Sequence, residues 1–219
     1  MNKKIIAILG GTGKEGKGLG YRWAKYGHTV ILGSRQAEKA ILAANELQEL
    51  LGGNFHVKGM TNAEAAKLAD VIVLTIPYSA HRDMCESIKE YAIGKMVIDV
   101  TVPLVPPKVT KVQMPLAGSA TMEAKEILGD QVNVAAAFQN ISYEHLFGEE
   151  KIECDVLVAG DSKNTRETVI LLVENAGLVG WDAGPIENSM VLEGLTSILI
   201  GLNKKYGSHS AGIKITGLV

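Results

Sequence analysis

The chain lacks the features that mark several large classes of protein. Only two of its 219 residues are cysteines, Cys85 and Cys154, and their separation is not a metal-ligand spacing. We therefore expect no metal site, and two reduced cysteines in the core of a cytoplasmic protein. The apolar runs are far shorter than a membrane span, and the first residues enter an apolar run with no room for a signal peptide. A membrane is therefore not an expected partner.

The chain also has no large excess of positive or negative charge, and it has few aromatic side chains. The chain has 22 Lys and Arg against 24 Asp and Glu, so it lacks the basic excess that binding of nucleic acid requires. Aromatic residues make up 5% of the chain and hydrophobic residues 47%, which suits an α/β protein rich in Val, Ile, Leu and Ala. The length allows one large domain with a small appendage.

The most informative pattern is a glycine-rich loop near the N-terminus. The apolar run Ile5–Leu9 is followed at once by Gly11-x-Gly13-x-x-Gly16 and then by a helix-compatible stretch. Gly11 permits a tight turn, Gly13 lets the backbone approach a pyrophosphate, and Gly16 lets the helix pack closely on the strand. Phosphates then sit over free N–H groups at the start of the helix. The pattern predicts a dinucleotide site that includes Gly11, Thr12, Gly13, Lys14, Glu15 and Gly16.

The end of the second expected strand indicates which dinucleotide binds. An NAD site places a carboxylate there to accept hydrogen bonds from the ribose hydroxyls. This chain has Ser34 and Arg35, with Lys39 one helical turn later. A hydroxyl and two cations suit the 2′-phosphate of NADP, and Thr12 adds another hydroxyl. The alternative is that the two cations belong to a solvated helix start, where cations are mildly unfavourable.

Strand and helix patterns alternate with short connections, which predicts a Rossmann-type, doubly wound parallel sheet. Expected strands, after Ile5–Leu9, are residues 28–32, 55–58, 71–75, 96–99, 132–138, 155–159 and 178–181. Expected helices are residues 16–26, 37–51, 62–68, 80–91, 119–128, 162–175 and 186–206. We expect residues 1–185 to form the dinucleotide-binding domain and residues 186–219 a small C-terminal helical cap that forms an oligomer interface. Ile76-Pro77 and Val102-Pro103 each follow a strand, at the edge where such sheets bind ligands.

Several segments together resemble one family. They are Gly-Gly-Thr-Gly at 10–13, Gly-Ser-Arg at 33–35, Leu-Thr-Ile-Pro at 74–77, Ala-Ala-Phe-Gln-Asn at 136–140, Asp-Val-Leu-Val-Ala-Gly-Asp at 155–161, Asp-Ala-Gly-Pro at 182–185, Glu-Gly-Leu-Thr at 193–196 and Gly-Ile-Lys-Ile-Thr at 212–216. The chain resembles the NADPH-dependent reductases of coenzyme F420, the F420H2:NADP oxidoreductases. The resemblance implies hydride transfer between C4 of the nicotinamide and C5 of a deazaflavin at the carboxyl edge of the sheet. It also implies a homodimer or a higher assembly.

The resemblance assigns roles to particular residues. Thr12, Ser34, Arg35 and Lys39 would hold the 2′-phosphate of NADP, and Ile76 and Pro77 would line the nicotinamide ribose. Residues 139–142, which are Gln139, Asn140, Ile141 and Ser142, would shape the pocket where nicotinamide meets deazaflavin, with Val102 on its floor. Two positions depart from relatives, because Gln139 replaces a histidine and Tyr78 replaces a tryptophan. These departures leave the second substrate open between a deazaflavin, a flavin and a small carbonyl.

No acid–base pair is evident in the pocket segments, which suits hydride transfer between stacked rings. His145 is the nearest candidate proton donor, although a surface histidine at a helix start is the simpler interpretation. One alternative function is an NADPH-dependent reductase of carbonyls or imines, whose relatives place a proton-donating lysine early in the last helix. Here no lysine occurs between Asn164 and Asn203, which counts against it. The other alternative is a non-catalytic NADPH sensor.

Overall fold

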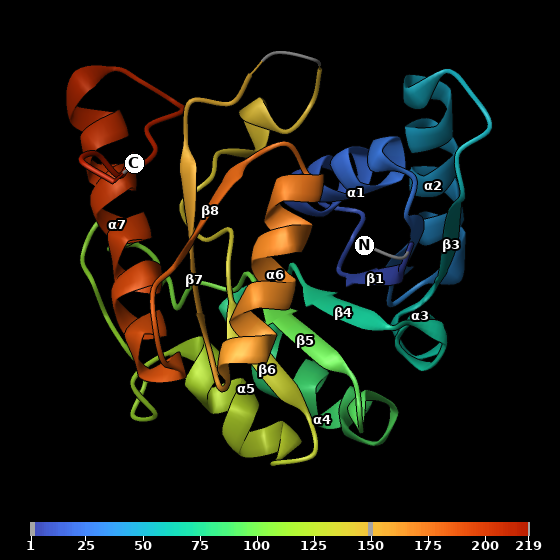
Figure 1. Ribbon diagram of the computed structural model, residues 1–219, viewed down its shortest axis with the longest axis horizontal. Coiled ribbons are helices and arrows are strands. Elements are labelled where there is room, and N and C mark those ends of the chain that lie inside the picture. The colour runs from blue at the N-terminus through green and yellow to red at the C-terminus, as the bar shows by residue number, and fades with distance from the viewer. Residues whose placement is uncertain (1–2, 149–150, 219) are drawn as a thin grey trace.

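The centre of the molecule is one eight-stranded sheet, with strands in the order β3-β2-β1-β4-β5-β6-β7-β8. The computed structural model describes residues 3–148 and 151–218 (Figure 1). The strands are β1 (Ile5–Leu9), β2 (Thr29–Ser34), β3 (Val57–Thr61), β4 (Val71–Leu74), β5 (Met96–Asp99), β6 (Asn133–Ala136), β7 (Asp155–Gly160) and β8 (Val179–Asp182). This architecture confirms the expected α/β, Rossmann-type class.

Two strands depart from the expected all-parallel sheet. The first six strands are parallel, but β7 runs antiparallel to β6, and β8 runs parallel to β7. A parallel return requires a crossover connection, usually a helix. The described part of the β6–β7 connection has no α-helix, only the 3₁₀ turn η2 (Tyr143–His145). The chain therefore returns beside β6 in the opposite direction.

Helices cover both faces of the sheet. They are α1 (Lys14–Tyr26), α2 (Ala37–Leu51), α3 (Asn62–Leu68), α4 (His81–Ala92), α5 (Ala120–Leu128), α6 (Lys163–Asn175) and α7 (Ser189–Tyr206), with short 3₁₀ turns η1 (Tyr78–Ala80) and η3 (Ile186–Asn188). One apolar core lies under α1, α2 and α6, and the other under α3, α4 and α5. Successive side chains of β1 alternate between them, with Ile6 and Ile8 in the first core and Ala7 and Leu9 in the second.

The fully buried Trp23 joins two helices that are far apart in sequence. Its indole N–H donates to the carbonyl of Leu172 in α6 at 2.8 Å, and its ring meets that of Phe138 edge to face at a centroid distance of 5.6 Å. Phe138 adopts a left-handed backbone with φ of 72°, which a bulky residue rarely adopts. This conformation turns the chain just after β6, at the carboxyl edge of the sheet.

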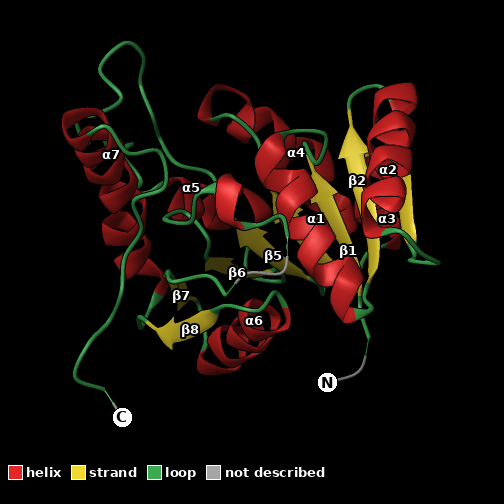
Figure 2. Cartoon of the chain, turned by 90° about the horizontal axis from the view of Figure 1, so that it is seen from above, coloured by secondary structure: helices red, strands yellow, loops and turns green. Residues whose placement is uncertain are grey.

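The last helix, α7, lies at the opposite end of the molecule from α2 and β3 (Figures 1 and 2). It contacts α5, β6 and β7, and it buries Leu192 and Leu199. The expected domain boundary at residue 185 stays a prediction. In the described chain, no helix is both long and apolar enough to cross a membrane.

Candidate functional site

Two glycines of the N-terminal loop are required by the packing of the protein itself. A Cβ on Gly11 would lie 2.6 Å from the carbonyl oxygen of Ile8, and one on Gly16 would lie 2.7 Å from Cα of Gly11. Gly13 differs, because a Cβ there would meet no protein atom closer than 3.7 Å. The missing side chain at Gly13 therefore leaves space for a ligand rather than for the fold.

The start of α1 is open to an anion. Gly13 is the residue that precedes the helix, and no side chain caps the first turn. The N–H groups of that turn have no partner within the helix, and the helix dipole favours negative charge there. This is the geometry that binds the pyrophosphate of a dinucleotide.

A cavity of about 1000 Å³, called the larger cavity here, extends from this loop along the carboxyl edge of β1, β2 and β4. Its described lining consists of Gly10, Thr12, Gly13, Ser34, Arg35, Gln36, Lys39, Asn62, Thr75, Ile76, Pro77, Ser79, Ala80 and Met84. The expected group Thr12, Ser34, Arg35 and Lys39 is thus brought together. No carboxylate occurs in this described lining, so nothing there repels a phosphate.

Gly10 and Asn62 line the larger cavity but were not predicted from the sequence. Gly10 has a φ of 72°, and its N–H donates to Oδ1 of Asn62 at 3.2 Å. A Cβ on Gly10 would lie 2.6 Å from Cγ2 of Ile76, so only glycine fits. The available signal was that Asn62 directly follows β3, which ends at the same sheet edge.

A second cavity of about 520 Å³, called the smaller cavity, shares Thr75, Ile76, Pro77 and Ser79 with the larger one. The rest of its described lining is Glu15, Tyr78, Val100, Thr101, Val102, Leu104, Pro106 and Val109. The residues are mainly apolar, as expected for a pocket that holds an aromatic ring. Glu15 therefore lies beside the smaller cavity, although it was expected in the dinucleotide site.

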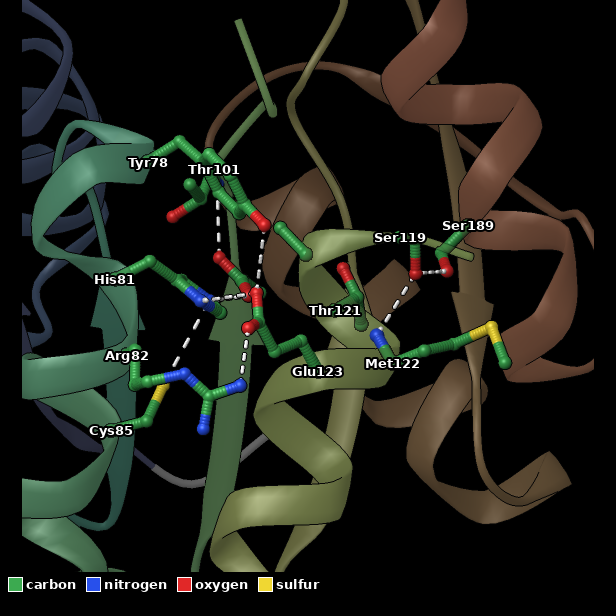
Figure 3. A network of polar contacts seen from close by, with 12 residues as sticks. Tyr78, His81, Arg82, Cys85, Thr101, Ser119, Thr121, Met122, Glu123 and Ser189 are labelled. Carbon is green, nitrogen blue, oxygen red and sulfur yellow. Dashed lines mark hydrogen bonds and ion pairs between the residues drawn. The ribbon is translucent and has the colours of Figure 1, made fainter. Parts of the chain in front are cut away.

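A buried network of polar side chains lies between α4, β5 and α5, beside the smaller cavity (Figure 3). Nε2 of His81 and Oδ2 of Asp99 are 2.7 Å apart, and the other oxygen of Asp99 accepts from the N–H of Thr101 at 2.9 Å. Burial opposes the charge on His81, but attraction by Asp99 and their hydrogen bond raise the pKa of His81 to about 11. His81 is therefore an imidazolium at neutral pH.

The same network fixes Tyr78. Its hydroxyl donates to Oε2 of Glu123 at 3.0 Å, and Arg82 donates to the other oxygen of Glu123 at 2.6 Å. Burial and the carboxylate of Glu123 raise the pKa of Tyr78 to about 12, so this phenol keeps its proton. The network thus holds Tyr78 and Thr101, two lining residues of the smaller cavity, in fixed positions.

The geometry agrees with the comparisons of this chain with known proteins. Residues 5–103 match a family described as coenzyme F420-dependent NADP oxidoreductase. The F420-dependent NADP reductase of Methanothermobacter marburgensis is 42% identical over 97% of this chain and 98% of its own length. The enzyme of the same name from Methanocaldococcus jannaschii is 38% identical over 97% of this chain and 98% of its own. The chain belongs to the F420-dependent NADP reductase family.

Solved structures support the fold of this family member. A structure from Arthrobacter sp. FB24 matches with a TM-score of 0.81 at 22% identity, over 98% of this chain and all of that one. An imine reductase from Bacillus cereus matches with a TM-score of 0.66 at 15% identity, over 94% of this chain and 63% of that one. At these identities the likeness shows the fold alone.

Part of the ring pocket expected for the reductase is not in the described lining of either cavity. Gln139 and Asn140 line neither cavity, and both side chains are buried. Nε2 of Gln139 donates to the carbonyl of Asp99 at 2.7 Å, and Nδ2 of Asn140 donates to the carbonyl of Leu192 at 2.8 Å. These amides join the end of β6 to β5 and α7. Direct contact of Gln139 or Asn140 with a substrate stays a prediction.

Four other residues from the sequence analysis also lie away from the lining of both cavities. Ile141 is buried, and Oγ of Ser142 donates to the carbonyl of His209 at 3.4 Å. Nζ of Lys14 lies 3.1 Å from the hydroxyl of Tyr143. Nε2 of His145 lies 3.1 Å from the carbonyl of Ser210, so the C-terminal tail holds this ring. Among described residues, no group of His, Cys, Asp or Glu is arranged to hold a metal ion, and both cysteines are buried and free.

Proposed function

We propose that this protein catalyses hydride transfer between NADP(H) and coenzyme F420. The observation that carries the proposal is the joining of two unlike cavities. The larger one has an open helix start and a carboxylate-free group of Ser34, Arg35 and Lys39 in its described lining. The smaller one is mainly apolar and meets it at Ile76 and Pro77. This arrangement suits a dinucleotide whose nicotinamide reaches the place where a second ring binds.

The chain's part in this reaction is to bind and align two rings. Gly13 and the first turn of α1 bind the pyrophosphate, Thr12, Ser34, Arg35 and Lys39 bind the 2′-phosphate, and Ile76, Pro77 and Val102 shape the meeting point of the rings. The nicotinamide and the deazaflavin supply the redox chemistry. Gln139 and Asn140 hold the carboxyl edge of the sheet in place, because their amides donate hydrogen bonds to the backbone of β5 and α7.

Mixing the protein with NADPH and oxidised coenzyme F420, and following the loss of deazaflavin absorbance, tests the proposal. We expect turnover with NADPH and much slower turnover with NADH. Parallel reactions with FMN and with a small cyclic imine cover the alternative acceptors. Turnover of the imine without turnover of F420 would assign the protein to the reductases of small carbonyls and imines. Tight NADPH binding with no turnover of any acceptor would support the sensor.

We also propose that the reductase is a cytoplasmic homodimer or a larger homo-oligomer that associates through α7. The exposed fractions of Met190, Val191 and Ile198 on this helix are 45%, 60% and 51%. An apolar face of this kind is typical of a subunit interface. Two free cysteines suit a reducing compartment. Light scattering after gel filtration tests the assembly, since Ile198→Glu should shift the protein to monomers, whereas Lys163→Glu on the exposed side of α6 should not.

A further inference from the structure

Two residues that line the smaller cavity each have one buried polar atom with no hydrogen-bond partner in the described protein. Among the residues that the structure describes, four buried side-chain atoms lack a hydrogen bond, and Oε1 of Glu15 and Oγ1 of Thr101 are two of them. Both residues line the smaller cavity, whose surroundings are otherwise mainly apolar. Buried polar atoms are nearly always paired in folded proteins, so this coincidence indicates that a bound molecule completes both bonds.

The carboxyl group of Glu15 is in an unusual setting. The residue lies in the first turn of α1 and is half-buried as a whole, but its Oε1 atom is enclosed. Burial without a compensating cation raises the pKa of Glu15 to about 8. The carboxyl group therefore carries its proton at neutral pH. A dinucleotide pyrophosphate at the start of α1 would disfavour the carboxylate further, because like charges repel.

The other titratable groups around Glu15 leave its proton available. Tyr78 is the only other titratable residue in the described lining of the smaller cavity, and its hydroxyl is engaged by Glu123. On α1 itself, the neighbouring Lys14 bonds to the hydroxyl of Tyr143. The lining segments that follow β4 and β5 contribute no charged side chain. Glu15 is thus the one group in this described lining whose proton can leave near neutral pH.

We propose that Glu15 is the proton donor to the hydride acceptor bound in the smaller cavity, and that the hydroxyl of Thr101 hydrogen-bonds to the same ring. This proposal rests on the proposed function, in which NADPH reduces a deazaflavin. That reaction needs one proton besides the hydride, since NADPH, F420 and H⁺ give NADP⁺ and F420H2. Sequence reasoning missed this role because Glu15 falls inside the glycine loop, where backbone groups dominate.

The proton step balances with groups already present. The hydride carries two electrons from C4 of the nicotinamide to C5 of the deazaflavin and leaves negative charge on the acceptor ring. The O–H bond of Glu15 breaks, a bond forms between its proton and a ring nitrogen, and Glu15 becomes a carboxylate. Glu15 regains a proton from water when the product leaves. In the reverse direction its carboxylate accepts that proton, as a general base.

The variant Glu15→Gln tests the step, because the amide keeps the size and a hydrogen-bond donor but cannot release a proton. We expect single-turnover reduction of F420 by NADPH to slow about 100-fold or more, the range of general acid catalysis. The wild-type rate should fall above about pH 8, the pKa of Glu15, and that limb should vanish in the variant. The NADPH dissociation constant should stay within about twofold. Glu167→Gln, the same change in an exposed ion pair of α6, is the matched control.

Infrared spectroscopy of the protein without substrates gives an independent measurement. Two protonated carboxyl bands should be present at pH 6: one from Glu193, whose pKa is about 7, and one from Glu15, which should titrate with a midpoint near 8 and be absent from Glu15→Gln. A midpoint near 4.5, the ordinary value, would overturn the proposal. So would a Glu15→Gln variant that reduces F420 at the wild-type rate with the wild-type pH profile, or one that loses only NADPH affinity. If the wild-type protein does not reduce F420 at all, the proposed function fails too, and the two failures are thereby distinguished.

Discussion

His81 and Asp99 form an ion pair of 2.7 Å between two side chains that have no exposed surface. One lies at the start of α4 and the other at the end of β5. The cavity-lining residues Tyr78 and Thr101 lie just before α4 and just after β5, so the pair joins the two segments that carry them. Removing one partner of a buried pair leaves the other charge buried without compensation, which lowers the free energy of unfolding by about 3–5 kcal/mol.

We therefore expect His81→Ala to lower the free energy of unfolding by about 3–5 kcal/mol, measured by urea denaturation at pH 7. Arg82→Ala removes a neighbouring ion pair whose cation is 58% exposed, and it should cost no more than about 1 kcal/mol. Equal losses in the two variants would contradict the importance of the buried pair.

Glu193 gives a pH-dependent prediction. Burial and repulsion by Asp99 raise its pKa to about 7, although the N–H groups of Ala120 and Thr121 and the hydroxyl of Thr121 bond to its carboxylate. The folded protein therefore binds this proton more tightly than the unfolded chain, whose Glu has a pKa of 4.5. The contribution of Glu193 to stability is largest below pH 4.5 and is lost as the pH rises to about 7.

The pKa difference corresponds to a loss of about 3 kcal/mol between these pH values. Glu193→Gln should remove this part of the pH dependence of unfolding, while Glu167→Gln should keep it. Denaturation curves at pH 4.5, 6 and 8 make the comparison. Parallel pH profiles for wild type and Glu193→Gln would show that Glu193 titrates normally.

The fold was largely predictable because local patterns and tertiary packing agree in most elements. The ranges of α2 and α3 were predicted to the residue, and α3 begins with a capping box formed by Thr61 and Glu64. The expected strand 55–58 was wrong by a few residues, since β3 covers Val57–Thr61. This polar edge strand is defined by its pairing with β2, and Gly59 lets the backbone of Ala40 in α2 approach it, which no strand periodicity reveals.

Candidate site residues could be predicted only where a short sequence motif marks them. The glycine loop and the group around Arg35 are each local in sequence, and Thr12 and Gly13 of the loop line the same cavity as that group. By contrast, the ion pair of His81 with Asp99 joins residues 18 positions apart in the sequence. The hydrogen bond from Gln139 to Asp99 joins residues 40 positions apart. Such pairings arise from the order of strands in the sheet. The separation of two cavities, and hence the position of Glu15, likewise depends on side-chain directions that a sequence does not give.

The different roles of two glycines can be separated by the same substitution. Gly16→Ala would bring a Cβ within 2.7 Å of the backbone at Gly11, so it should lower the melting temperature by several degrees. Gly13→Ala meets no protein atom within 3.4 Å, so it should keep the fold and weaken NADPH binding by at least about tenfold. Calorimetric melting and isothermal titration measure both effects. Normal NADPH affinity in Gly13→Ala would show that the ligand does not approach this backbone.

Arg35→Asp tests the choice of dinucleotide. It removes a charge-assisted hydrogen bond to the 2′-phosphate and adds a repelling charge, so NADPH binding should weaken by about 3 kcal/mol or more, over 100-fold. NADH affinity should change little, because NADH lacks that phosphate. Lys89→Asp on α4 makes the same charge change outside the described lining of both cavities and should leave NADPH affinity intact. Equal affinity of the wild-type protein for NADH and NADPH would contradict the assignment.

Gln139→Ala tests whether the edge of the sheet must be held in place for turnover. Its amide bonds to the carbonyl of Asp99, whose carboxylate in turn holds the N–H of Thr101 at the smaller cavity. Loss of this tie should let Thr101 and the bound ring shift, and a misplacement of about 1 Å costs on the order of 100-fold in rate. Turnover with F420 should therefore fall by about 10-fold to 100-fold, with the NADPH dissociation constant nearly unchanged.

Gln48→Ala is the matched control, since Nε2 of Gln48 makes a comparable bond of 3.0 Å to the carbonyl of Val57 on the far edge of the sheet. If Gln139→Ala keeps its turnover at saturation but loses NADPH binding, Gln139 acts on the dinucleotide; if Gln48→Ala slows turnover equally, a general loss of rigidity explains both.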